Sequence, residues 1–375
     1  MPYFDHAATT SLSKSALDAM NTVFKEYYGN PSSLHDVGIK ARKLMNQTKN
    51  ELASLLSCER KNVIVTASGT EANNIAIQGV YNHNPSLTLI TSEVEHHATL
   101  NTIKYLKSKG ANVIILPVNN QGHILLEDLE DALKKGPSLV SLIYANNEIG
   151  TLLNHQEVNK LCKKYHALLH LDMVQAPLHE VIDFKALDVD FVSISAHKFH
   201  GPKGIGLLLA RDLNNFDRII HGGKQEFEKR SGTENLASLV GMLTALKEAY
   251  QKHDEEYHHL KELSHYFIEQ LNQSNIHYTL NGPKISDRRL NSILNLGFYD
   301  IDAQWLSFEL NQRGIHVSLG SACDSDNIEP SHVLKALKVD EKFIHGSLRF
   351  SLGLENQKQD IDEAISVLKE LLNDA

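Results

Sequence analysis

Residues 193–206 read SISAHKFHGPKGIG, an apolar strand pattern followed by a lysine, a turn and three closely spaced glycines. The strand pattern delivers Lys198 into a turn between hydroxyl and imidazole groups. The glycines let other backbone approach that lysine closely. A lysine held partly away from water keeps a neutral amine that attacks an aldehyde, so the pattern favours a Schiff-base lysine that carries a covalent cofactor. The alternative is an ordinary solvated surface lysine.

A second apolar run, residues 167–175 (ALLHLDMVQ), leads into an acid and then a glutamine. Side chains at the carboxyl ends of strands line the ligand crevice of an open parallel α/β sheet. At such a position, Asp172 would pair with the protonated ring nitrogen of pyridoxal phosphate and keep the ring an electron sink. Gln175 would donate to the phenolate oxygen of the same ring. The alternative for Asp172 is a helix N-cap after a strand.

A phosphate site is expected in residues 62–74 (NVIVTASGTEANN), where a strand pattern passes through small residues into a helical pattern. Gly69 and Thr70 would open the helix and aim backbone N–H groups and a hydroxyl at an anion. Residues 230–235 (RSGTEN) repeat the Ser-Gly-Thr pattern. The alternative in both places is a simple helix cap.

Short apolar runs alternate with helical patterns over the first two thirds of the chain, which predicts an α/β fold with a mostly parallel sheet. A helix is expected over residues 36–57, a long one over residues 233–272 and a closing one from about residue 357. Strands are expected near the following residues: Val63, Leu87, Val113, Leu139, Leu168, Phe191, Ile205, Ile293, Ile315 and Arg349.

The composition fits a soluble enzyme and excludes several other classes. With 375 residues, 42% of them hydrophobic, the chain can bury a core large enough for two domains. Its net charge of -9 argues against a dedicated nucleic-acid surface. No apolar window is long enough to span a bilayer, and the N-terminus lacks the apolar part of a signal peptide. Three cysteines without paired spacing predict a reducing cytoplasm, and no HExxH or CxxC pattern predicts a metal site.

Taken in order, these motifs resemble those of the pyridoxal phosphate-dependent cysteine desulfurases, the NifS/IscS-like branch of the class V aminotransferase family. The resemblance runs nearly end to end and rests on residues 4–10 (FDHAATT), 29–31 (GNP), 95–98 (EHHA), 146–150 (NNEIG), 193–206, 230–233 (RSGT), 320–323 (GSAC) and 347–353 (SLRFSLG). It implies the type I fold of pyridoxal phosphate-dependent transferases. The expected parts are a large cofactor-binding domain (residues 16–253), a small α+β domain (residues 254–375) carrying the catalytic cysteine loop, and an N-terminal segment (residues 1–15) packed with the small domain.

The resemblance also implies roles for individual residues. Lys198 would hold the cofactor and shuttle the α-proton, and His96 would stack on the ring and relay protons. Asn147 would hydrogen-bond the cofactor near its phenolate oxygen and help to bind the substrate. The phosphate would be held by Gly69, Thr70, Ser195 and His197 and, from the neighbouring subunit of a homodimer, by Thr233.

Two further residues define the reaction that the resemblance implies. Arg349 would offer a two-pronged contact to the carboxylate of an amino acid, a contact that a lysine could not reproduce. Its alternative is a solvated strand arginine. Cys323, in a small and polar stretch, would be the nucleophile that accepts sulfur. Asp324 stands where the family usually has threonine or serine, and Leu319 replaces a small polar residue.

The expected activity is therefore removal of sulfur from L-cysteine, giving L-alanine and a persulfide on Cys323. The persulfide would pass to a sulfur-acceptor protein for iron-sulfur cluster assembly or tRNA thiolation, with no membrane and no direct nucleic-acid contact. A selenocysteine lyase or another enzyme of the class V aminotransferase family is the first alternative, and its activity would survive loss of Cys323. A non-catalytic sulfur carrier is the second.

Overall fold

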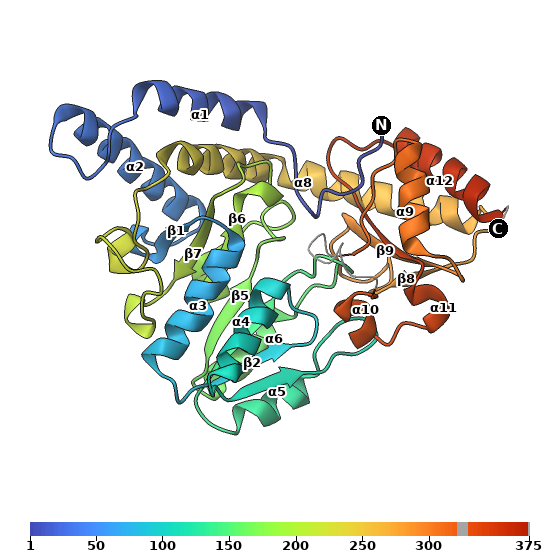
Figure 1. Ribbon diagram of the computed structural model, residues 1–375, viewed down its shortest axis with the longest axis horizontal. Helices are drawn as coiled ribbons and strands as arrows, with labels where there is room; N and C mark the ends of the chain where they lie inside the picture. The colour runs from blue at the N-terminus through green and yellow to red at the C-terminus, as the bar shows by residue number, and fades with distance from the viewer. Residues whose placement is uncertain (321–328, 374–375) are drawn as a thin grey trace.

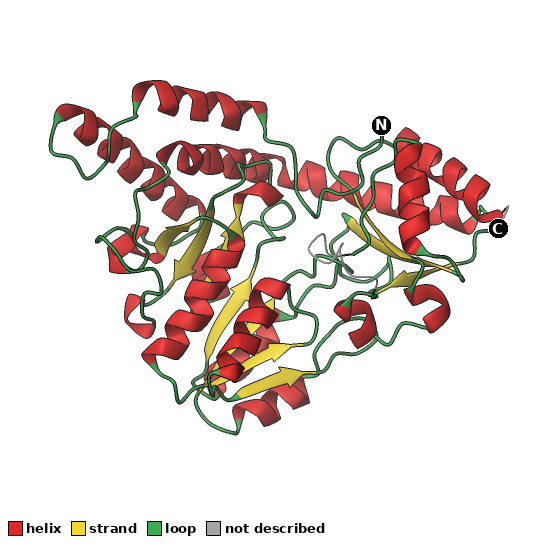
Figure 2. Ribbon diagram, in the orientation of Figure 1, coloured by secondary structure: helices red, strands yellow, loops and turns green. Residues whose placement is uncertain are grey.

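The computed structural model describes residues 1–320 and 329–373, and Cys323 lies outside them. The described residues form a seven-stranded sheet wrapped by helices and, beside it, a three-stranded sheet with helices of its own (Figures 1 and 2). One long helix, α8 (Leu236–Asn272), runs from the first part into the second (Figure 1). At 1.5 Å per residue, its 37 residues span about 55 Å.

The large sheet has the strand order β1-β7-β6-β5-β4-β2-β3. Its strands are β1 (Val63–Thr66), β2 (Thr88–Ser92), β3 (Val113–Leu116), β4 (Ser138–Ile143), β5 (Leu168–Asp172), β6 (Phe191–Ser195) and β7 (Gly206–Ala210). Strands β2 to β6 pair in parallel, and only β7 pairs antiparallel, with β1 and β6. Every residue of β4, β6 and β7 is buried because helices cover both faces. The predicted mostly parallel sheet is confirmed.

The helices of the large part begin where the sequence carries caps. Helix α3 starts at the predicted Gly69, with the Ser68 side chain accepting from Glu71 N at 3.1 Å. The predicted helix over residues 36–57 ends at Leu55, two residues early. The helices around this sheet are α1 (Lys14–Glu26), α2 (Asp36–Leu55), α3 (Gly69–His83), α4 (His97–Ser108), α5 (Leu126–Leu133), α6 (His155–Lys164) and α7 (Phe184–Leu187).

The small sheet has the order β10-β9-β8 and is antiparallel throughout. Its elements are β8 (Tyr278–Asn281), β9 (Ile293–Phe298), β10 (Ser347–Ser351), α9 (Ala303–Gln312), α10 (His332–Ala336), α11 (Glu341–Ile344) and α12 (Lys358–Asn373). A separate cluster of buried apolar residues lies under it, and α8 contributes Leu263 and Phe267. The first half of α8 instead packs into the core of the large sheet through Leu239 and Leu246. The exact boundary between the two parts, expected at residues 253 and 254, stays a prediction.

The N-terminal segment lies along the small sheet. Phe4 N donates to His316 O at 2.8 Å, and Ser351 N donates to Phe4 O at 2.7 Å. The strand predicted near Ile315 is wrong. Only two isolated bridges form there, at His316 with Tyr3 and at Ser318 with Arg349, because the segment pairs with two different partners for one residue each.

Candidate active site

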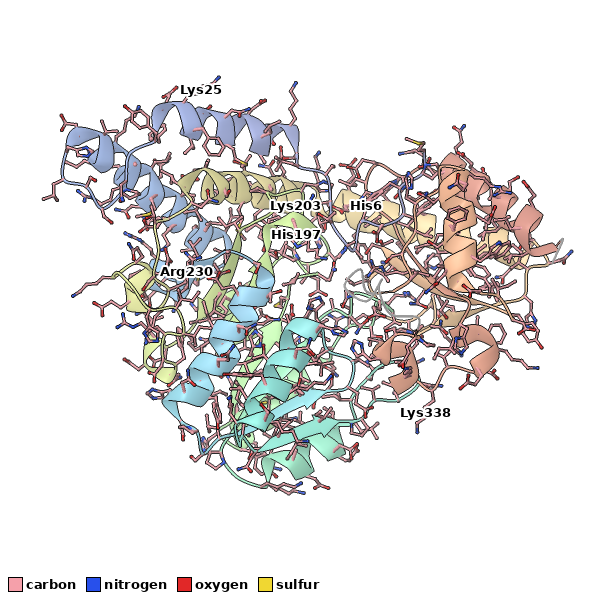
Figure 3. All side chains as sticks on the ribbon, in the orientation of Figure 1. His6, Lys25, His197, Lys203, Arg230 and Lys338 are labelled. Atoms are coloured by element: carbon pink, nitrogen blue, oxygen red, sulfur yellow. The ribbon has the colours of Figure 1, made fainter. Side chains whose placement is uncertain are left out.

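A cavity of about 220 Å³ opens at the carboxyl ends of β4, β5 and β6. Ligand sites of open α/β sheets occupy this position. The cavity brings together ten of the twelve predicted site residues, which are Gly69, Thr70, His96, Asn147, Asp172, Gln175, Ser195, His197, Lys198 and Arg349. The other two are Thr233, which does not line it, and Cys323, which lies outside the described residues. Figure 3 shows His197 and His6 near the junction of the two parts.

The N-terminus of α3 forms an anion cradle at one end of the cavity. Backbone N–H groups of the first helical turn have no partner within the helix, and the helix dipole favours negative charge there. A Cβ on Gly69 would come within 2.6 Å of Val174 Cγ2, so any larger residue there would force Val174 to shift. The buried Ser195 and the half-buried His197 line the same cavity.

Asp172 supplies a fixed buried carboxylate at the end of β5. It is 4% exposed, and its two oxygens accept from Asn73 Nδ2 at 2.6 Å and from Val174 N at 3.1 Å. No helix follows it, so the N-cap alternative is wrong. A buried carboxylate that faces a cavity favours a cationic partner, and a protonated pyridine nitrogen has that charge.

Lys198 ends the 3-10 turn η2 (Ala196–Lys198), directly after β6. Its Nζ donates to Ala7 O at 2.5 Å and to Ala8 O at 2.9 Å. Gln175 Nε2 donates to the same Ala7 oxygen at 2.8 Å. The N-terminal segment thus forms one wall of the cavity and holds the lysine that the sequence analysis singled out. The half-buried position of Lys198 excludes the solvated surface lysine.

The two site histidines are kept neutral by burial. Burial lowers the pKa of His96, against the opposing effect of Asp172. The Nδ1 of His96 accepts from Ala98 N at 3.1 Å, which assigns the proton of the neutral ring to Nε2. Burial, helped by Lys198 and Lys203, lowers the pKa of His197 to about 4. Both rings are therefore uncharged at neutral pH, and each can donate one hydrogen bond and accept another.

Arg349 lies in β10 and reaches the cavity from the small sheet. It is 1% exposed, so the solvated strand arginine is excluded. Its Nη1 donates to Asn147 O at 2.9 Å and its Nη2 to Asp5 Oδ1 at 2.8 Å. Nε has no partner among the described residues. A guanidinium placed this way can still offer N–H groups to an incoming carboxylate.

Thr233 is exposed and follows a strained turn on the flank of the large sheet. Arg230, on the side away from the small sheet (Figure 3), donates through Nε to Glu71 Oε1 at 2.7 Å. Glu71 Oε2 in turn accepts from Ala67 N at 3.1 Å, just before the anion cradle. The segment that carries Thr233 is thus fastened to the cradle, while Thr233 itself does not line its own cavity.

The residues taken together fit pyridoxal phosphate. The cradle could hold a phosphate, the buried Asp172 could accept a hydrogen bond from a protonated ring nitrogen, and Lys198 could offer its amine to an aldehyde. Sequence reasoning gave no role to Asn73, which fixes Asp172, or to Asp5, Ala7 and Ala8. Residues 4–10 and 62–74 contain all four, so the motifs were visible and only their contacts were missing.

The two described cysteines are poor nucleophiles. Burial raises the pKa of the half-buried Cys58 to about 11 and of the buried Cys162 to about 12, so both thiols stay protonated at neutral pH. Within residues 1–320 and 329–373, no three His, Cys, Asp or Glu side chains are grouped to hold a metal ion. No helix in that same part of the chain is long and apolar enough to cross a membrane.

Comparisons with known proteins agree over nearly the whole chain. The aminotransferase class V model matches residues 2–364. The chain is 40% identical over 372 residues to a cysteine desulfurase IscS of Dictyoglomus turgidum, which covers 99% of this chain and 94% of that protein. Identity to the cysteine desulfurase IscS of Methanosarcina thermophila is 38%, covering 99% and 91%. Two solved NifS-like proteins superimpose over the full length of both chains, one at 33% identity and a TM-score of 0.92, the other, from Rickettsia africae, at 31% and 0.88.

Proposed function

Because the chain belongs to the aminotransferase class V family and is a cysteine desulfurase of its NifS and IscS branch, we propose that the cavity at the strand ends binds pyridoxal phosphate together with L-cysteine, and that Cys323 receives the sulfur. The predicted family and fold are confirmed by these similarities. Enzymes of this family generally depend on pyridoxal phosphate. The observation that carries the proposal is the meeting of Asp172, Lys198 and Arg349 in one cavity.

The cofactor would be held at three points. Gly69 and Thr70, with Ser195 and His197, would surround the phosphate at the N-terminus of α3. Asp172, fixed by Asn73, would pair with the ring nitrogen. Lys198 would hold the aldehyde carbon, and His96, Asn147 and Gln175 would line the ring. When bound, pyridoxal phosphate supplies an electron sink for the α-carbon of an amino acid.

The protein's own residues would position the substrate and move its protons. Arg349 would bind the carboxylate of L-cysteine through its guanidinium N–H groups. The amine of Lys198 would carry the proton from the α-carbon, since its Nζ lies in the cavity beside two backbone carbonyls that stabilise its charged form. His96, neutral and with its proton on Nε2, would relay a proton to or from the substrate.

The sulfur atom of L-cysteine would then pass to Cys323. The thiolate of Cys323 would attack the sulfur of the substrate, the bond from Cβ to sulfur would break, and a proton would be added at carbon. One L-cysteine and one thiol thus give one L-alanine and one persulfide, with no external oxidant. A sulfur-acceptor protein, serving iron-sulfur cluster assembly or tRNA thiolation, would take the outer sulfur.

A homodimer completes the proposed site. The exposed side chain of Thr233 would reach the phosphate of the neighbouring subunit, and the brace from Arg230 to Glu71 would hold its segment in place. Analytical ultracentrifugation tests this part. A fully active monomer at the working concentration would rule it out. The cytoplasmic location stays a prediction.

The main test is a product balance. Purified protein receives L-cysteine and a reducing thiol, and alanine and sulfide are quantified for the wild type, for Cys323→Ser and for Cys58→Ser as the matched control. We expect equal alanine and sulfide from the wild type and from Cys58→Ser, because the Cys58 thiol stays protonated. Cys323→Ser should give neither product.

Other outcomes would redirect the assignment. Alanine from Cys323→Ser at the wild-type rate would contradict the persulfide step and favour the selenocysteine lyase type. Absence of alanine from the wild type, with the cofactor bound, would point to another reaction of the class V aminotransferases. A protein that binds no cofactor at all would support a sulfur carrier.

A further inference from the structure

Arg349 already holds a carboxylate before any substrate arrives. Its Nη2 donates to Asp5 Oδ1 at 2.8 Å, and the two side chains form an ion pair. The guanidinium is 1% exposed, whereas the Asp5 side chain is 22% exposed and comes two residues before Ala7, which lines the cavity. A buried guanidinium without a counter-charge would be strongly destabilising, so Asp5 neutralises Arg349 in the empty site.

The backbone around Asp5 is held firmly, which fixes where its carboxylate can go. Asp5 O accepts from Ala8 N at 3.0 Å, and Asp5 forms a bridge with Ser351 of β10, two residues after Arg349. Ala7 N, two residues on, donates to Ser351 Oγ at 2.9 Å. The backbone on both sides of Asp5 is therefore hydrogen-bonded, and it presents the Asp5 carboxylate to the guanidinium.

We propose that Asp5 is a positioning residue that occupies one arm of Arg349 as an internal competitor of the substrate carboxylate. This proposal rests on the proposed function, because it assumes that the substrate carboxylate binds at Arg349. A substrate carboxylate that arrives at this guanidinium meets the charge of Asp5 at short range, and like charges repel. Binding of the substrate carboxylate thus requires that Asp5 breaks its hydrogen bond to Arg349 Nη2 or that both carboxylates contact the guanidinium.

The role has a direction that distinguishes it from a merely structural one. If Asp5 only held Arg349 in shape, removing its charge would weaken the binding of carboxylates. If it competes, Asp5→Asn tightens their binding, since the amide oxygen still accepts from Nη2 but no longer repels the ligand. The same change should lower the melting temperature of the empty protein, because the buried guanidinium loses its counter-charge.

The test compares two ligands that differ in the carboxylate alone. Cofactor-loaded protein is titrated with L-alanine and with ethylamine, which is alanine without its carboxylate, and the change in cofactor absorbance gives each affinity. We expect Asp5→Asn to bind L-alanine about fivefold more tightly, as for the loss of one partly screened like charge, with ethylamine unchanged. Melting curves should show a larger stabilisation by L-alanine in Asp5→Asn than in the wild type.

Two controls separate the possible failures. Ser351→Ala removes hydrogen bonds to the same segment but leaves the Asp5–Arg349 pair, so it should keep the wild-type ratio of the two affinities. Asp5→Glu keeps the charge and should not tighten L-alanine binding. If Asp5→Asn fails to fold, Asp5→Glu is compared with the wild type in its place. In that case fivefold tightening in Asp5→Glu would overturn the proposal.

Weaker or equal L-alanine binding in a folded Asp5→Asn also overturns the proposal, as does an equal change for ethylamine. Arg349→Lys tells this failure apart from failure of the proposed function. If Arg349→Lys leaves L-alanine binding unchanged, the role of Arg349 is wrong, and the competition by Asp5 falls with it. If Arg349→Lys weakens L-alanine alone and Asp5→Asn does not tighten it, only the role of Asp5 is wrong.

Discussion

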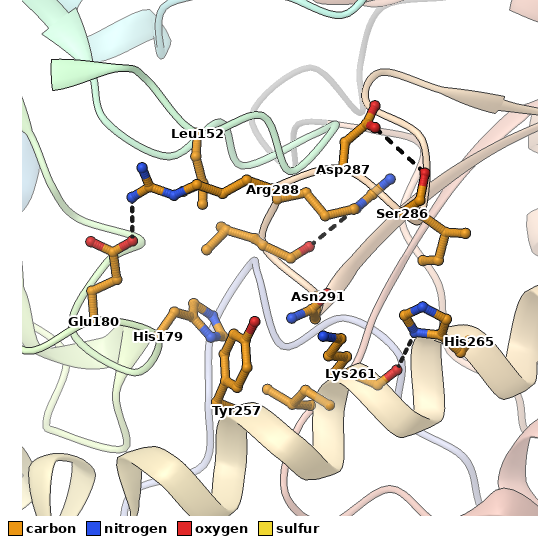
Figure 4. A pocket seen from close by; sticks show the side chains of 14 residues that line it. Leu152, His179, Glu180, Tyr257, Lys261, His265, Ser286, Asp287, Arg288 and Asn291 are labelled. Carbon is orange, nitrogen blue, oxygen red and sulfur yellow. Dashed lines mark hydrogen bonds and ion pairs between the residues drawn. The ribbon is translucent and has the colours of Figure 1, made fainter. Parts of the chain in front are cut away.

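Two of the cavities in the described part of the chain are lined by charged side chains and use those charges differently. The larger, about 430 Å³, lies where α8 meets residues 285–291 and residues 179–180 (Figure 4). There Glu180 pairs with Arg288 at 3.1 Å and also accepts from Tyr144, while Arg289 donates only to backbone carbonyls. Glu180 and Arg288 thus satisfy each other, and backbone carbonyls satisfy Arg289, across a joint between elements. We call this space the junction cavity.

The smaller cavity, at the strand ends, is lined by residues from distant parts of the chain. Some of their buried polar atoms have no hydrogen-bond partner among the described residues. Arg349 keeps Nε without a described partner, and Asn73 Oδ1, beside Asp172, has none among the described residues either. Buried polar groups normally find partners, so exceptions of this kind point to a missing ligand. Of these two cavities, volume alone would favour the junction cavity. The buried polar atoms without partners favour the cavity at the strand ends.

Lys198→Ala should have the largest effect on this contrast. Among the described residues that line the strand-end cavity, Lys198 is the one lysine. Its loss removes both the attachment of the cofactor and the proton carrier, so turnover should fall by a factor on the order of 10³ or more. The cofactor absorbance that depends on the lysine should vanish as well. Lys203→Ala, an exposed lysine in the same loop, is the matched control and should keep wild-type turnover. An unchanged visible spectrum in Lys198→Ala would contradict the assignment of Lys198 as the residue that holds the cofactor.

Arg349→Lys comes next in size. A lysine keeps the charge but loses the planar fork that matches a carboxylate, so KM for L-cysteine should rise about tenfold or more while kcat changes less. Steady-state kinetics over a range of L-cysteine concentrations measures both constants. A fall in kcat with an unaltered KM would mean that Arg349 acts on the reacting atoms and not on the carboxylate.

The sequence could predict those features of the site that depend on residues close together in the chain. It could not predict contacts between residues that are far apart in the chain. The apolar runs and the Ser-Gly-Thr cap are local, so the large sheet, the start of α3 at Gly69 and the turn carrying Lys198 could be predicted. The family motifs carried Arg349 and His96 in the same way. Contacts such as Asn73 to Asp172, 99 residues apart, or Asp5 to Arg349, 344 apart, depend on how the two parts pack. No spacing within a motif contains that information.

The pH dependence of stability should differ in sign between Glu95, which precedes the strand-end cavity residue His96, and His179 of the junction cavity. Glu95, directly before His96, is fully buried, and desolvation raises its pKa to about 8. The folded protein therefore keeps a proton that the unfolded chain loses near pH 4.5, and stability falls as the pH rises from there through 8. At the junction cavity, burial lowers the pKa of His179 to about 4, so its contribution rises with pH up to about 6.5 and is constant above it.

Glu95→Gln isolates the first of these contributions. Between pH 6.5 and 8, the difference in free energy of unfolding between Glu95→Gln and the wild type should shift in favour of the variant, by at most about 1.4 kcal/mol per pH unit. Urea denaturation at several pH values measures it, and the contribution of Glu256, also buried, cancels in the comparison. A difference that stays constant with pH would mean that the Glu95 carboxyl is already ionised in the folded protein.

Glu180→Gln should have the smallest effect and tests the junction cavity directly. The pair of Glu180 with Arg288 is partly solvated, since Arg288 is 64% exposed, and such pairs contribute less than about 1 kcal/mol. A glutamine can still accept from Tyr144, so the melting temperature should drop only slightly and turnover should stay at the wild-type value. Because Glu180 and Arg288 of the junction cavity pair with each other, replacing them should change the stability of the protein and not its turnover. A loss of turnover in Glu180→Gln comparable to that of Arg349→Lys, at unchanged stability, would break the contrast and make the junction cavity part of the working site.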